Sequence, residues 1–232
     1  MTPGAAPPPE PAPADRPRRF VVKVCGVTRL EDATLACELG ADRIGFILAD
    51  SPRRATLEQV ATITPSLPDT VTPTGVFVNA SPEEIAAAFD AGIRLAQLHG
   101  DEDTAWCEAL GLPYTKVIRV QTGDDVRRAL DYACDEVLVE AKVDGRYGGP
   151  GVPLPDDIVD AALALDRRVM LAGGLGPANV FAALEHAHRT PGRAPYGIDA
   201  SSSLEASPGH KDPDKLRRFF AEIDRFIEET VA

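Results

Sequence analysis

Hydrophobic and polar positions follow a repeated plan along this chain. Eight short apolar runs each end in a polar or glycine-rich stretch and then lead into a segment of helical composition. Short apolar runs without strict alternation are typical of buried parallel strands. The predicted strands are residues 20–25, 43–48, 73–79, 95–99, 115–120, 136–142, 168–172 and 196–200. The predicted helices are residues 28–40, 103–110, 124–132 and 213–230, with others starting near 56, 81, 155 and 178.

Two helices carry recognisable start signals. Thr28 with Glu31 three residues later has the spacing of a capping box. Ser81 followed by Pro82 fits an N-cap with proline at the first helical position. We therefore expect these helices to begin at Thr28 and Ser81.

Strands separated by helix-length segments must be parallel, and eight such units predict a closed (β/α)8 TIM barrel. A doubly wound open sheet is the alternative, and it would carry a glycine-rich phosphate fingerprint after the first strand. The residues there are Cys25, Gly26, Val27 and Thr28 instead. Polar residues also end the strands all along the chain, which favours the barrel.

Composition separates residues 1–19 from the rest. This Pro- and Ala-rich stretch lacks the apolar core of a signal peptide, and we expect a disordered arm before one barrel domain over residues 20–232. No later stretch is long and apolar enough to cross a membrane. The net charge of −12 argues against nucleic acid or an anionic membrane as partner, but a small anionic substrate stays compatible.

The four cysteines show no metal-ligand or disulfide spacing. Neither a zinc site nor a disulfide framework is expected, and a reducing, cytoplasmic location fits this pattern. Lys23 and Cys25 lie two apart on the first strand, so both side chains should point into the barrel, with Cys25 nearer the carboxyl end.

Active sites of TIM barrels lie at the carboxyl ends of the strands. Those positions hold a thiol, an arginine, an imidazole, carboxylates and two amide-rich turns. The candidate site residues are Cys25, Arg53, Gln97, His99, Glu140, Gly173, Gly174, Asp199, Ser201 and Ser202. Each alone also has a structural explanation, such as core packing for the cysteine or a helix cap for the serines. The turns after the seventh and eighth strands are the usual phosphate site of this fold, so a phosphorylated substrate is expected.

Several segments, in order and with suitable spacing, resemble the phosphoribosylanthranilate isomerase family. They are residues 23–28, 45–47, 51–53, 75–79, 97–100, 172–175 and 207–212. The resemblance implies an Amadori rearrangement of N-(5-phosphoribosyl)anthranilate in tryptophan biosynthesis, without metal or organic cofactor. For the assembly we expect a monomer, with a dimer as the alternative.

The resemblance also assigns roles. It places the general base at Cys25 and the contact with the anthranilate carboxylate at Arg53. It places the phosphate at Gly173, Gly174, Ser201 and Ser202, and it puts Asp199 near the substrate. Lys23 could favour the thiolate form of Cys25. Glu140 must supply the general acid, where the family has an aspartate.

Three departures from the family pattern lie in the site itself. Glu140 is one methylene longer than aspartate, Ser203 replaces a glycine after the eighth strand, and the loop 143–153 lacks the family's lysine. A glycine at position 203 would suit a positive φ or a close phosphate. Two alternatives therefore remain beside the isomerase: a paralogue acting on another aminosugar phosphate, and a catalytically silent phosphosugar-binding barrel.

Overall fold

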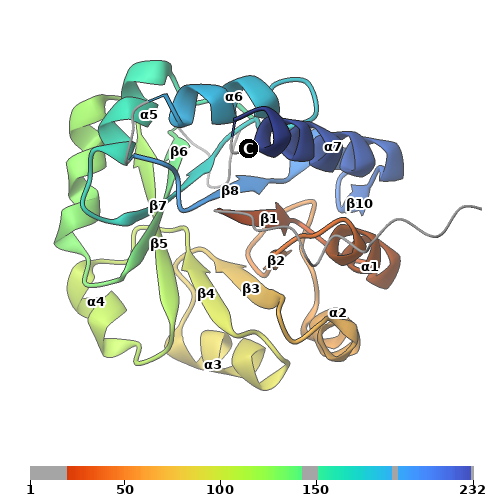
Figure 1. The fold of residues 1–232 in the computed structure, drawn as a ribbon. Coiled ribbons are helices and arrows are strands. Elements are labelled where there is room, and N and C mark those ends of the chain that lie inside the picture. Colours follow the sequence, from red (N-terminus) through yellow and green to blue (C-terminus); the bar gives the residue numbers. More distant parts are fainter. Residues whose placement is uncertain (1–19, 143–150, 190–192, 231–232) are drawn as a thin grey trace, which may run out of the picture.

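The computed structural model describes residues 20–142, 151–189 and 193–230. Eight parallel strands follow one another in chain order and close into a barrel, with β8 hydrogen-bonded to β1 (Figure 1). The strands are β1 (Val21–Cys25), β2 (Arg43–Ile47), β3 (Thr72–Phe77), β4 (Leu95–Leu98), β5 (Tyr114–Val120), β6 (Glu136–Ala141), β7 (Arg168–Ala172) and β8 (Gly197–Ala200). The predicted (β/α)8 barrel is confirmed and the open sheet is excluded.

Helices surround the barrel on the outside (Figure 1). The α-helices are α1 (Leu30–Glu38), α2 (Leu57–Ile63), α3 (Pro82–Asp90), α4 (Thr104–Ala109), α5 (Asp156–Leu163), α6 (Val180–Ala187) and α7 (Pro213–Thr230). The 3-10 helices are η2 (Thr64–Ser66), η3 (Gly123–Asp131) and η4 (Ser202–Leu204). The segment predicted as a helix after β5 is thus a 3-10 helix. The arm predicted for residues 1–19 lies outside the described residues.

One of the two predicted helix starts is confirmed. Ser81 caps α3, its hydroxyl accepts from the Glu84 N–H, and Pro82 is the first helical residue. The prediction for Thr28 is wrong, because α1 begins at Leu30 after Arg29, without a side-chain cap. The Thr28 hydroxyl instead donates to the Gly209 carbonyl at 2.6 Å. A tertiary contact therefore takes the group that a local cap would have used.

A short hairpin departs from the repeated strand–helix plan. Strands β9 (Glu205–Ser207) and β10 (His210–Lys211) pair antiparallel between β8 and α7. Gly209, with φ of 79°, forms part of the turn, a conformation that glycine adopts without strain. This hairpin was not predicted from the pattern of strands and helices.

The barrel interior contains charged layers as well as apolar side chains. Near the amino ends, Arg43 donates to both carboxylate oxygens of Glu136 at 2.6 and 2.7 Å. Above it, Lys23 is 1% exposed and Cys25 is 5% exposed. Both point into the barrel as predicted, so a buried cation lies one layer below the thiol.

Candidate active site

A single cavity at the carboxyl ends of the strands brings the predicted site residues together. Its volume is about 390 Å³. All ten candidates line it, namely Cys25, Arg53, Gln97, His99, Glu140, Gly173, Gly174, Asp199, Ser201 and Ser202. Residues of the loop after β2, Val76 of β3 and Gly151 are among the other residues that line it. We call this space the mouth cavity.

Cys25 is the last residue of β1 and lies at the floor of the mouth cavity. Its neighbour in register is Gly45 of β2, and a Cβ there would lie 2.8 Å from the thiol sulfur. Glycine at that position therefore makes room for the thiol. Burial raises the pKa of the Cys25 thiol, and the attraction of Lys23 for the thiolate offsets only part of this effect. The expectation that Lys23 favours the thiolate is thus correct in direction but outweighed by desolvation.

Lys23 divides its hydrogen bonds between two strands. Its ammonium donates to Gln97 Oε1 at 2.8 Å and to Asp199 Oδ2 at 2.9 Å. The other oxygen, Asp199 Oδ1, is buried and has no hydrogen-bond partner among the described residues. A buried carboxylate oxygen without a hydrogen-bond donor costs free energy, so this atom is suited to accept a hydrogen bond from a hydroxyl group of a ligand.

Gln97 sets the tautomer of His99. Because the Lys23 ammonium can only donate, the Gln97 oxygen faces it and the Gln97 amide nitrogen faces His99 Nδ1 at 3.3 Å. His99 Nδ1 is then the acceptor, and the ring proton is on Nε2. His99 Nε2 donates to Glu140 Oε1 at 2.5 Å. This contact leaves Oε2 as the Glu140 oxygen available for proton transfer.

Glu140 and Cys25 approach the mouth cavity from different sides. Strands β7 and β8 separate β6 from β1 around the closed barrel. Glu140 is 4% exposed, so its carboxyl is held inside the mouth rather than in solvent. A thiol and a carboxyl therefore face the same space from separate strands, as an acid–base pair acting on one substrate requires.

The turn after β7 depends on its two glycines. Gly173 and Gly174 have φ values of 105° and 62°. A Cβ at Gly173 would lie 2.6 Å from the Val152 carbonyl oxygen, and one at Gly174 would lie 2.4 Å from that of Gly151. The chain after β6 thus passes directly over this turn. Only glycine fits both the backbone conformation and the close approach.

The turn after β8 supplies the serines. Ser201 donates to the Cys25 carbonyl at 3.1 Å, and Ser202 begins the short helix η4. Ser203 does not adopt a positive φ, so the serine in place of the family's glycine is not strained. Its hydroxyl donates to the Leu175 carbonyl and links the two turns. Of the two reasons for a glycine at position 203, a positive φ therefore does not apply to this chain.

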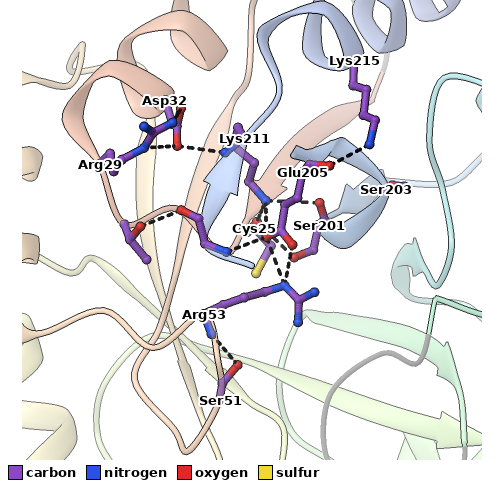
Figure 2. A network of polar contacts seen from close by, with 12 residues as sticks. Cys25, Arg29, Asp32, Ser51, Arg53, Ser201, Ser203, Glu205, Lys211 and Lys215 are labelled. Carbon is purple, nitrogen blue, oxygen red and sulfur yellow. Dashed lines mark hydrogen bonds and ion pairs between the residues drawn. The ribbon is translucent and has the colours of Figure 1, made fainter. Parts of the chain in front are cut away.

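Arg53 extends into the mouth from the loop after β2. Its Nε donates to Glu205 of β9 at 3.0 and 2.8 Å (Figure 2). Glu205 is not among the residues predicted for the site, and Lys211 belongs only to the segment 207–212 that resembles the family. Lys211 is fully buried and donates to the Cys25 and Ser201 carbonyls at 2.6 and 3.1 Å. The hairpin therefore connects the arginine loop to the ends of β1 and β8.

Two further observations concern the described ranges. They contain no group of three or more His, Cys, Asp or Glu residues placed to hold a metal ion. In the same ranges, no helix has both the length and the apolar character needed to cross a bilayer. The fold and the cavity define a (β/α)8 barrel whose mouth holds a thiol, a carboxyl and two turns that contain glycine or serine.

Comparison with known proteins agrees with this class. The family model described as N-(5'phosphoribosyl)anthranilate (PRA) isomerase matches residues 22–222. The N-(5'-phosphoribosyl)anthranilate isomerase of Pseudomonas fluorescens (strain Pf0-1) is 42% identical over 201 residues, covering 85% of this chain and 95% of that protein. The chain belongs to the N-(5'-phosphoribosyl)anthranilate isomerase family.

Solved structures show the same relationship. Phosphoribosyl anthranilate isomerase from Thermus thermophilus is similar with a TM-score of 0.78 and 36% identity, covering 89% of this chain and 99% of that one. Another phosphoribosyl anthranilate isomerase, in complex with reduced 1-(o-carboxyphenylamino)-1-deoxyribulose 5-phosphate, has a TM-score of 0.76 and 31% identity over the same shares. That ligand carries a phosphate and an aromatic carboxylate at its two ends.

Proposed function

We propose that the chain catalyses the Amadori rearrangement of N-(5-phosphoribosyl)anthranilate to the 1-deoxyribulose 5-phosphate product, a step of tryptophan biosynthesis. The observation that carries the proposal is the placement of Cys25 and Glu140 in one cavity, on strands separated by β7 and β8. Membership of the isomerase family supports the same reaction.

The substrate would lie across the mouth cavity. Its phosphate would meet the turns at Gly173–Gly174 and Ser201–Ser202, where backbone N–H groups suit an anion. Its carboxylate would meet Arg53, since a guanidinium binds carboxylates through paired N–H groups. Asp199 Oδ1, which lacks a partner, would accept a sugar hydroxyl.

The reaction needs one acid and one base. Glu140 would protonate the ring oxygen through Oε2, and the furanose opens to a Schiff base. Cys25, as the thiolate, would then remove the proton from C2, and the enolamine tautomerises to the ketone. His99 would hold Glu140 through Oε1, while Gln97 holds the other ring nitrogen of the histidine. All of these groups belong to the protein, so the proposal includes no cofactor.

The proposal also covers location and assembly. A reducing cytoplasm suits the four free cysteines, which the structure shows unpaired. We propose a monomer, with a dimer as the alternative that sedimentation would detect.

Complementation tests the function directly. The chain should restore growth of a tryptophan auxotroph that lacks this isomerase, and the purified protein should convert N-(5-phosphoribosyl)anthranilate. A protein that binds the phosphosugar without turnover would instead support the silent barrel, and turnover of only another aminosugar phosphate would support the paralogue.

A further inference from the structure

The carboxylate of Glu205 holds Arg53 from one side. Both Glu205 oxygens accept from Arg53 Nε, at 3.0 and 2.8 Å. In the described part of the chain, neither terminal nitrogen of Arg53 has a hydrogen-bond partner. Figure 2 shows these terminal nitrogens turned away from Glu205. The end of the guanidinium, which carries two parallel N–H groups, is therefore free to bind a carboxylate.

Glu205 is itself firmly fixed. It is 6% exposed and lies between two cations, since Lys211 Nζ also donates to it at 3.2 Å. The Gly209 N–H donates to the same carboxylate oxygen at 3.3 Å. A buried carboxylate with several donors has little freedom to move. Arg53 is thus tied to a rigid anchor rather than left as a long side chain on a loop.

The space for this arrangement depends on the turn after β1. A Cβ at Gly26 would lie 3.2 Å from Arg53 Cδ and 3.5 Å from Glu205 Oε1. The positive φ of 74° at Gly26 also favours glycine. Arg53 and Glu205 therefore meet directly over the turn that follows Cys25. The direction of the guanidinium is set relative to the strand that carries the thiol.

We propose that Glu205 is a positioning residue that directs the free end of Arg53 toward the aromatic carboxylate of the substrate. This inference rests on the proposed function, because it needs a substrate with a carboxylate. Arg53, Glu205 and Lys211 together carry one net positive charge, so the cluster still attracts an anion. Because Glu205 occupies Arg53 Nε, only the terminal nitrogens of the guanidinium are left to bind a ligand. The ligand carboxylate can therefore approach from one direction only.

Paired ligands test the proposal in the full chain. The first is reduced 1-(o-carboxyphenylamino)-1-deoxyribulose 5-phosphate, and the second is the same compound without the aromatic carboxyl group. The unchanged protein should prefer the first. Glu205→Gln should weaken binding of the first about tenfold and leave the second within about twofold, because the amide does not anchor the guanidinium as a carboxylate does. Glu205→Asp should restore part of the preference.

Lys215→Met is the matched structural control. Lys215 donates to the Glu205 backbone carbonyl at 2.7 Å, so this change loosens the hairpin without touching the carboxylate. It should leave the preference for the carboxylated ligand intact. Arg53→Lys should lose the preference, and adding Glu205→Gln to it should cause no further loss.

The outcomes separate this inference from the proposed function. An unchanged protein that binds both ligands equally would overturn both. An unchanged protein that prefers the carboxylated ligand, together with a Glu205→Gln variant that keeps this preference, would overturn only the inference. If Glu205→Gln weakens the binding of both ligands equally, the inference is also overturned, since that result indicates a general disturbance of the mouth cavity.

Discussion

His99 Nε2 and Glu140 Oε1 lie 2.5 Å apart. His99 directly follows β4 and Glu140 lies in β6, so the two residues come from either side of β5. Because Gln97 occupies the other ring nitrogen, the histidine donates its only ring proton to Glu140. Glu140 is one methylene longer than the aspartate of the family pattern, and in this chain the longer arm ends against a fixed donor. The carboxyl of Glu140, which replaces the aspartate of the family pattern, thus has a defined position in the site.

The thiol of Cys25 should be needed for turnover. Cys25→Ser replaces it with a hydroxyl, which is a far poorer base at neutral pH. We expect kcat to fall by roughly 10²-fold or more while the affinity for the reduced product analogue stays nearly unchanged. Cys37→Ser, in α1, is the control because Cys37 does not line the mouth cavity. Nearly full activity of Cys25→Ser would mean that the cysteine serves only packing.

The pH dependence follows from the same residue. Burial raises the pKa of Cys25 above its ordinary value of 9.0, so the thiolate fraction grows as the pH rises. We expect log kcat/KM to increase between about pH 7 and about pH 9, measured at constant ionic strength. A level profile over this range would contradict a base at Cys25.

The stability of the fold should fall as the pH rises, whereas the activity should increase. The folded protein holds the Cys25 proton more tightly than the unfolded chain does. Its contribution to stability is therefore complete below pH 9.0 and is lost as the pH rises through the folded-state pKa. Urea unfolding should be measured as the pH rises above 9.0. The free energy of unfolding should fall less for Cys25→Ala than for the unchanged protein.

The glycine turn after β7 should control phosphate affinity. Gly174→Ala places a Cβ 2.4 Å from the Gly151 carbonyl, at a φ of 62°. We expect about tenfold weaker binding of inorganic phosphate in calorimetry, equivalent to about 1.4 kcal/mol. Gly111→Ala is a matched control, since its φ is 66° and nothing lies within 4 Å of the added Cβ. Equal phosphate binding by both variants would place the phosphate elsewhere.

Much of the fold followed from periodicity because its signals are repeated and local. Every predicted strand appears in the barrel, and α7 spans the predicted residues. The site candidates could be collected because carboxyl ends of parallel strands meet at one edge. That rule alone predicted that Cys25 and Glu140 lie at the same site, and both line the mouth cavity in the structure.

The rest depends on contacts between distant residues. Arg53 and Glu205 are 152 positions apart, and Glu205 lies in a hairpin that the strand–helix plan does not include. Thr28 carries a local capping pattern, but its hydroxyl bonds to Gly209 because the hairpin brings that carbonyl close. The pairing of His99 with Glu140 likewise needs the closed barrel. No single segment carries a signal for any of these contacts.

The central claim is that Glu140 supplies the acid for an isomerisation in which Cys25 is the base. The most direct measurement is kcat for N-(5-phosphoribosyl)anthranilate in the unchanged protein, Glu140→Gln and Glu140→Asp. Glutamine keeps the shape but has no carboxyl proton to give, so kcat should fall roughly 10²-fold or more. Aspartate restores the residue of the family pattern and should keep activity within about tenfold of the unchanged protein. Equal kcat in all three proteins would contradict the acid role of Glu140.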